Sequence, residues 1–254
     1  HHVFVSCFCL LAFDLNRVIE AAQVGPGHRS LEGVEDIVED RAARLEQYQD
    51  LAYANNYRAM VERVAQIDSG VELTQAVARN LFKLMAYKDE YEVARLYSDP
   101  AFRAQLEAEF EGDYRLEFHL APPLLAKRDA DTGLPTKRTI GGWILPVFKV
   151  LAKFRRLRGT ALDPFGYFPE RRQERELITN YRALLEEVMT SITGDHGTDN
   201  YATAVELAKL PAQVRGYGHV KARNIEQQEI RQQRLLSVLR GDAIAVVNVY
   251  ESAA

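Results

Sequence analysis

Two polar residues in the first half of the chain could take part in chemistry because of where the sequence pattern places them. Lys88 falls between Leu84 and Tyr91 on the apolar stripe of a predicted helix, where a lysine either reaches out to solvent or pairs with a carboxylate. His119 lies in a segment of alternating polar and apolar residues, on the same face as the basic Arg115 and the acidic Glu117. A histidine there could carry a proton, although a hydrogen-bonded surface histidine is the more common arrangement.

A second candidate group follows in the segment RGYGHVK, Arg215–Lys221. Its glycines allow close backbone approach, and a helix is predicted to begin directly after it, so His219 and Lys221 lie beside a helix N-terminus that could bind an anion. The segment matches neither the dinucleotide-binding nor the ATP-binding glycine motif. The candidate polar site is Lys88, His119, His219 and Lys221, and the sequence offers no recognisable catalytic residue or metal-ligand set.

Positive charge is concentrated between Lys127 and Arg158, although the whole chain has a net charge of −4. The helix predicted from Pro146 places its basic residues on one side and, on the other, Val147, Phe148, Val150, Leu151 and Phe154. Such a surface could steer an acidic partner, or it could be the solvated face of a core helix. The candidate docking surface consists of Lys127, Arg128, Lys137, Arg138, Lys149, Lys153, Arg155 and Arg156.

Composition and length are those of an ordinary globular protein, and 254 residues can bury a substantial core. The negative net charge gives no general indication of nucleic-acid binding. Cys7 and Cys9 cannot by themselves form a zinc or iron–sulfur site, and a reducing cytoplasmic location is expected. The apolar segment Val3–Phe13 is too short to span a bilayer.

The spacing of apolar residues predicts a mostly helical chain. It is helical over residues 31–67 and again from Thr74 through Tyr91, and Asp99-Pro100 predicts the start of a further helix. Later helices are expected over residues 146–158, 170–192, 199–211 and 222–240.

The pattern changes at Tyr114–Leu120, where apolar and polar residues alternate as in a half-buried strand. A second short strand is expected near residues 137–140. The predicted fold is therefore mainly α, an irregular multi-helix single domain over residues 1–254 with a small antiparallel β element near 114–140. Our hypothesis for the two strand-like ends, Val3–Phe13 and Ala243–Tyr250, is that they pair with each other.

Four segments of the chain resemble the C-terminal helical region of the indolepyruvate ferredoxin oxidoreductases, a family of 2-oxoacid:ferredoxin oxidoreductases. They are NLFKLMAYKDEYEVARLY, EFHLAPPLL, LDPFGY and RGYGHVK. The resemblance covers most of the chain and fades before Ser30 and after Arg240, which leaves 1–29 and 241–254 as poorly matched terminal segments.

In that family, long chains oxidise arylpyruvates such as indolepyruvate to acyl-coenzyme A and pass the electrons to ferredoxin. The resemblance implies that thiamine diphosphate, magnesium and iron–sulfur clusters belong to other parts of the full enzyme, because no residue here matches the motifs that hold them. No cofactor is therefore expected in this chain, and whether it is an enzyme by itself stays open.

We expect an accessory, non-catalytic domain of such an oxidoreductase that serves in assembly or partner docking. The expected partners are the catalytic domains of the same enzyme and ferredoxin, with no nucleic acid and no membrane, and a homo-oligomer is left open. One alternative is a stand-alone binding module whose basic amphipathic helix contacts an anionic partner. Another is an enzyme in its own right, with Lys88, Glu117, His119 and His219 in one pocket.

Overall fold

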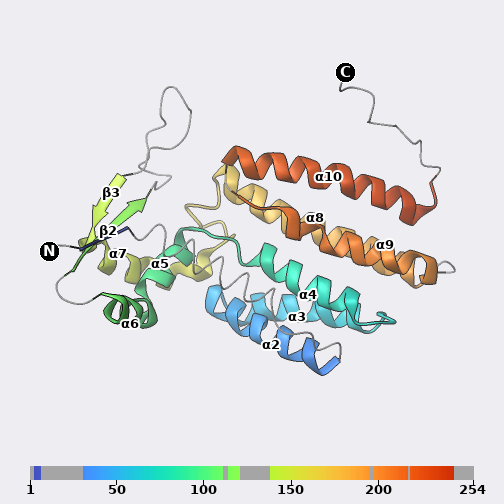
Figure 1. Cartoon of the computed structure of the whole chain (residues 1–254), viewed down its shortest axis with the longest axis horizontal. Helices are drawn as coiled ribbons and strands as arrows, with labels where there is room; N and C mark the ends of the chain where they lie inside the picture. Colours follow the sequence, from blue (N-terminus) through green and yellow to red (C-terminus); the bar gives the residue numbers. More distant parts are fainter. Residues whose placement is uncertain are drawn as a thin grey trace, which may run out of the picture. The chain divides into compact units, whose positions relative to one another are not determined.

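The computed structural model describes residues 3–6, 31–110, 114–120, 138–194, 197–216 and 218–242. Those residues form nine α-helices and a small sheet, so the predicted mainly α fold with a small antiparallel β element is confirmed (Figure 1). The expected single domain divides into two compact units, each assembled from segments far apart in sequence. Unit 1 comprises His1–Gly27, Arg44–Ala54 and Ala86–Glu176, and unit 2 comprises His28–Ala43, Asn55–Met85 and Leu177–Ala254.

Two helices, rather than one continuous helical run, occupy residues 31–65. The first, α2, spans Leu31–Tyr48, and α3 spans Leu51–Ala65. The break has a local cause, because the Asp50 carboxylate accepts a hydrogen bond of 2.9 Å from the backbone N–H of Tyr53. A side chain that satisfies a free N–H in this way caps the start of a new helix.

A second break corrects the prediction of one helix that continues past residue 85. Helix α4 spans Glu72–Met85, and α5 spans Glu90–Ser98. Asp89 has an extended backbone conformation, and its carboxylate accepts a hydrogen bond of 2.8 Å from the backbone N–H of Glu92, so it is the N-cap of α5. Lys88 therefore lies in the connection between two helices and not on a helical stripe.

The small sheet of unit 1 contains the two predicted strands and a third one. Strand β2, Tyr114–Leu120, pairs antiparallel with β3, Arg138–Gly141. Strand β1, Val3–Ser6, pairs in parallel with β2, which gives the order β1-β2-β3. The N-terminal strand therefore pairs with β2, and Ala243–Tyr250, with which we expected it to pair, lies outside the described part of the chain.

The core of unit 1 forms where β2 meets helices α5, α6 (Pro100–Glu109) and α7 (Leu145–Lys153). As the alternation predicts, Phe118 of β2 is fully buried. Its ring contacts Tyr97 of α5 and Phe148 of α7 edge to face, with centroid distances of 4.8 and 5.5 Å. Because burying one large apolar side chain contributes roughly 1.5–3 kcal/mol, this aromatic cluster holds α5 and α7 against the sheet.

Capping and glycine conformation set the ends of the helices in unit 1. Asp99 accepts a hydrogen bond of 2.9 Å from the backbone N–H of Ala101 and caps α6, as predicted. The short 3-10 helix η1, Gly142–Ile144, precedes α7, and η2, Phe154–Leu157, follows it. Gly159 ends this helical stretch with a φ of 74°, a conformation that glycine adopts without strain.

Unit 2 contains the last three helices of the chain, of which α8 also begins in unit 1. They are α8 at Pro169–Ile192, α9 at Gly197–Lys209 and α10 at Gly218–Arg240, and the 3-10 helix η3 at Leu210–Gln213 follows α9. Helices α9 and α10 begin a few residues earlier than the sequence predicts. Within the unit α9 packs against α4 and α10 (Figure 1).

Buried tyrosines in unit 2 keep their hydroxyl groups hydrogen-bonded. The Tyr57 hydroxyl donates to the backbone oxygen of Ala78 at 2.9 Å, and the Tyr181 hydroxyl donates to that of Ala208 at 2.8 Å. Both rings are buried, so these bonds remove the penalty of an unsatisfied polar group in the core. No described helix is both long enough and apolar enough to cross a membrane.

Candidate functional site

A buried ion pair joins Asp89 to Arg158 in unit 1. The two side chains are only 3% and 2% exposed. The guanidinium donates to both carboxylate oxygens of Asp89, at 2.9 Å from Nη2 to Oδ1, and also donates to the backbone oxygen of Tyr48. Its central carbon lies 3.5 Å from the centre of the Tyr48 ring, which is a cation–π contact.

The surroundings of Arg158 and Tyr48 fix the charge states of these two side chains. Burial alone lowers the pKa of Arg158, but the hydrogen bonds and the charge of Asp89 raise it above its ordinary value, so the guanidinium stays charged. Burial, reinforced by Asp89, raises the pKa of the Tyr48 hydroxyl well above its usual range, so this hydroxyl stays neutral. The Arg158 guanidinium, hydrogen-bonded to Asp89 and to the backbone of Tyr48, therefore has the properties of a structural clamp.

The carboxylate of Asp163 organises the LDPFGY segment next to this clamp. It accepts hydrogen bonds from the Tyr91 hydroxyl at 3.1 Å and from the backbone N–H groups of Gly159 at 2.8 Å and Phe165 at 3.1 Å. A Cβ atom on Gly166 would lie 2.8 Å from an oxygen of that carboxylate, so any larger residue there would push the carboxylate out of place. The segment is thus a turn closed around one buried carboxylate.

The two candidate polar residues of unit 1 have different surroundings. Lys88 is half-buried, and burial lowers the pKa of its ammonium group. His119 is half-buried on β2, where its Nδ1 lies 3.2 Å from the hydroxyl oxygen of Thr139, its cross-strand neighbour on β3. This contact supports the hydrogen-bonded interpretation of His119 over that of a proton carrier.

The other two candidate polar residues belong to unit 2, where they lie in the first turn of α10. Lys221 is half-buried, and the side chain of His219 lies outside the described part of the structure. Gly216 just before the helix has a φ of 91°, and a Cβ atom there would lie 2.8 Å from a methyl group of Val220. The glycine pattern thus serves a tight turn, and the four candidate residues are divided between the two units.

A lysine that the sequence pattern did not single out closes the same turn from α4. The Lys83 ammonium donates to the backbone oxygens of Pro211 at 2.8 Å and Ala212 at 3.0 Å. Burial, followed by the positive charges of Arg215 and Lys221, lowers the pKa of Lys83 to about 8. The Lys83 ammonium therefore lies near the positive charges of Arg215 and Lys221, and two backbone carbonyl oxygens accept its hydrogen bonds.

The candidate docking surface is described in part. Lys149, Lys153 and Arg156 are exposed on α7 and η2, and Arg155 is half-buried. Arg138 begins β3, but its side chain lies outside the described part of the structure, as do Lys127, Arg128 and Lys137. Arg158, at the end of the basic stretch, is not on this surface because it is buried against Asp89.

An exposed apolar stripe runs beside these cations. It consists of Trp143, Val147, Val150 and Phe154, whose exposed fractions are 71%, 50%, 55% and 50%. The prediction that all the apolar residues of this helix share one side is therefore corrected, because Phe148 and Ala152 are its buried residues. With 3.6 residues per turn, the spacing of the stripe defines a second apolar face.

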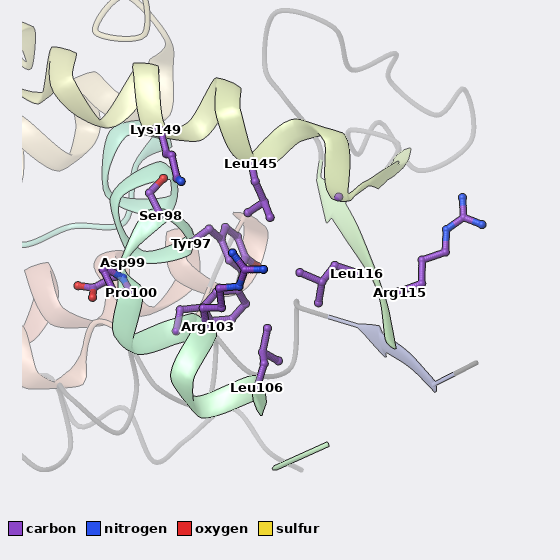
Figure 2. A pocket seen from close by; sticks show the side chains of 12 residues that line it. Tyr97, Ser98, Asp99, Pro100, Arg103, Leu106, Arg115, Leu116, Leu145 and Lys149 are labelled. Carbon is purple, nitrogen blue, oxygen red and sulfur yellow. The ribbon is translucent and has the colours of Figure 1, made fainter. Parts of the chain in front are cut away.

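A pocket of about 540 Å³ lies between α5, α6, β2 and α7 (Figure 2). Leu106, Leu116 and Leu145 contribute apolar wall, and Arg103 and Lys149 contribute positive charge. Figure 2 shows the Arg103 side chain extending toward the space between these leucines, whereas Arg115 points away from it. In the described part of the chain, no group of three or more His, Cys, Asp or Glu residues could hold a metal ion.

Sequence reasoning missed Arg158, Lys83, the apolar stripe and the pocket for different reasons. Only the stripe had a readable signal, the spacing of Trp143, Val147, Val150 and Phe154 along one helix face. The partners of Arg158 and Lys83 lie 69 or more residues away in sequence, and the pocket depends on how three helices and a strand pack.

Comparison with known proteins gives one informative match. A model described as "Family of unknown function (DUF6537)" matches residues 34–234, which is most of the chain. No curated protein and no solved structure matches significantly. The extent of the family match makes this chain a member of DUF6537.

Proposed function

We propose that this chain is an accessory, non-catalytic domain of an indolepyruvate-type 2-oxoacid:ferredoxin oxidoreductase, in which it serves assembly and partner docking in the cytoplasm. The resemblance of four segments to that enzyme family supports the proposal. The chemistry of two of these segments supports it as well, because Asp89 and Asp163 have their carboxylates occupied by structural hydrogen bonds.

The observation that carries a docking role is the outer face of α7. We define the α7 face as the apolar stripe Trp143, Val147, Val150 and Phe154 together with the basic residues Lys149, Lys153 and Arg156. The basic residues follow the spacing i, i+4, i+7, so they form a second row along the helical stretch. An exposed apolar patch with charge at its rim is typical of a protein interface.

The positive charge of the α7 face favours an acidic partner. Ferredoxins are acidic proteins, and a row of cations beside an apolar centre would attract and orient such a partner. In the proposed complex, thiamine diphosphate, magnesium and iron–sulfur clusters are held by the catalytic domains of the enzyme. The present chain would then contribute contacts and would hold none of these groups.

The fluorescence of Trp143, the single tryptophan of the chain, provides a direct test. We expect ferredoxin to change this fluorescence on binding at low ionic strength, and added salt to weaken the complex. Reversing the charges of Lys149, Lys153 and Arg156 should abolish binding. Reversing Lys209, Arg223 and Arg234, which are exposed cations of unit 2, is the matched control and should leave binding intact. Equal binding by both triple variants would contradict a docking role for the α7 face.

The same face also favours a second candidate function, a stand-alone module that contacts an anionic membrane or polymer. Apolar residues beside cations on a helix are the pattern by which a protein lies on an acidic lipid surface. Blue-shifted Trp143 fluorescence with phosphatidylserine vesicles, without any response to ferredoxin, would favour this alternative. A response to ferredoxin alone would remove it.

A further inference from the structure

We propose that the pocket between α5, α6, β2 and α7 is a binding site for a small amphipathic carboxylate with an aliphatic body. The pocket belongs wholly to unit 1, and its proposed ligand does not depend on the function proposed above. Its volume of about 540 Å³ falls in the range of roughly 300–1,000 Å³ that is usual for small-molecule sites.

The apolar wall of this pocket is built on rigid parts of the core. Tyr97 and Leu106 are 5% and 1% exposed and belong to the aromatic cluster around Phe118. Leu116 and Leu145 are half-buried and complete the wall from β2 and α7. Because the wall presents mostly hydrocarbon, an apolar ligand body gains free energy by leaving water. These contacts favour an aliphatic chain over a sugar or a nucleotide.

Three cationic side chains and one carboxylate line the pocket. The carboxylate, Asp99, is already engaged, because it caps α6 and lies 3.9 Å from the guanidinium of Arg95. Arg115 points away from the space (Figure 2). Arg103 and Lys149 are therefore the residues suited to hold an anionic head group.

The intramolecular contact of Arg103 is weak enough to be exchanged for a ligand. Its Nε lies 3.4 Å from the Glu107 carboxylate, and the two side chains are 79% and 61% exposed. Exposed pairs of this kind contribute only about 0–1 kcal/mol. A carboxylate held over the apolar wall would instead accept charge-assisted hydrogen bonds from Arg103 and Lys149 in a partly dehydrated site.

The head group is inferred to be a single carboxylate because, of the three cations that line the pocket, only Arg103 and Lys149 are placed to hold an anion. A polyphosphate would need more donors than these two side chains offer, and much of the remaining lining is leucine, tyrosine and phenylalanine. A neutral aliphatic ligand would gain the apolar contacts but would leave the two cations without a new partner. The site therefore discriminates between an acid and an alcohol of the same chain length.

Titration of the full chain with octanoate and with octan-1-ol, followed by calorimetry, tests the proposal. We expect saturable binding of octanoate at a single site and weaker binding of octan-1-ol. Arg103→Glu should raise the Kd of octanoate at least about tenfold, because it replaces a charge-assisted hydrogen bond by repulsion. The same substitution should leave the Kd of octan-1-ol unchanged.

Two further variants separate the pocket from the α7 face. Leu145→Phe fills the pocket and should weaken the binding of both octanoate and octan-1-ol. Unfolding curves will show that this variant is folded. Lys153→Glu lies on the same helix as Lys149 but does not line the pocket, so it should leave octanoate binding unchanged. In contrast, Lys153→Glu should weaken the binding of ferredoxin, whereas Arg103→Glu should leave it unchanged.

The proposal is overturned if octanoate shows no saturable binding to the folded wild-type chain. It is also overturned if Arg103→Glu and Lys153→Glu change the octanoate affinity equally, or if octan-1-ol binds as tightly as octanoate. Ferredoxin binding is measured on the same variants. The results can therefore reject the pocket as a ligand site without rejecting the docking role of the α7 face, or reject the docking role without rejecting the pocket.

Discussion

At the scale of single residues, removal of Arg158 is expected to have a large effect on stability. Arg158→Met leaves the Asp89 carboxylate buried without its counter-charge. Breaking a buried pair from one side lowers the free energy of unfolding by roughly 3–5 kcal/mol, which urea denaturation measures. Arg156→Met, an exposed neighbour, should change it by less than about 0.5 kcal/mol. Similar values for both variants would mean that the clamp contributes little.

The depressed pKa of Lys83 predicts a dependence of stability on pH. Its pKa is about 8 in the folded chain and roughly 10.4 in an unfolded one. Between these values the unfolded state binds more protons, so the free energy of unfolding rises with pH. This gain is absent below pH 8 and complete above the unfolded pKa. Wild type should therefore gain stability relative to Lys83→Met between about pH 8 and pH 10, and a constant difference would contradict the prediction.

Residue-scale chemistry was the part of the molecule least accessible from sequence. The alternation of β2 correctly placed Phe118 in the core and His119 on the polar side. The same reasoning treated Asp89 as one of a set of helix-surface charges, because its partner Arg158 lies 69 residues away. Local spacing carries no information on such long-range pairs, and the pattern could not show that the basic stretch ends in a buried residue.

At the scale of elements, α7 has one apolar face in the core and another in solvent. Phe148 is 6% exposed and stacks on Tyr97, whereas Val150 is 55% exposed. Phe148→Ala should lower the free energy of unfolding by roughly 3–5 kcal/mol, and Val150→Ala should change it by less than about 0.5 kcal/mol. A large loss in Val150→Ala, measured by urea denaturation, would show that the outer face is packed.

In the LDPFGY turn, we expect the substitution of Gly166 to destabilise the chain. A methyl group at Gly166 would press on the Asp163 carboxylate at 2.8 Å, whereas one at Gly194 would have its nearest neighbour at 3.7 Å. We expect Gly166→Ala to lower the free energy of unfolding by roughly 1–3 kcal/mol, the usual result of overpacking. Gly194→Ala is the control, and thermal unfolding that ranks the two equally would contradict this account.

Most elements could be predicted from the sequence, and the exceptions have local causes. The strand Tyr114–Leu120 and the start of α6 after Asp99 follow directly from alternation and from a cap-proline pair. The breaks at Asp50 and Asp89 were missed because the apolar spacing continues across each of them. In both cases a carboxylate cap starts a new helix, and this preference outweighs the periodicity.

At the scale of the whole molecule, each of the two units is assembled from segments far apart in sequence, so no linker composition could mark the division. The docking residues and the pocket both belong to unit 1. Unit 1 therefore contains both surfaces on which the proposed binding roles depend, and substitutions confined to exposed residues of unit 2 serve as controls for both.

The central claim is that the α7 face docks an acidic electron carrier. The most direct measurement is the rate of ferredoxin reduction by the oxidoreductase of which this chain is proposed to be a domain, with wild type and with Lys149, Lys153 and Arg156 reversed to glutamate. We predict that the triple variant raises the KM for ferredoxin at least about tenfold at low ionic strength, because electrostatic steering is lost, and that reduction of a small neutral dye is unchanged. An unchanged KM for ferredoxin, with the same dependence on salt as wild type, would contradict the claim.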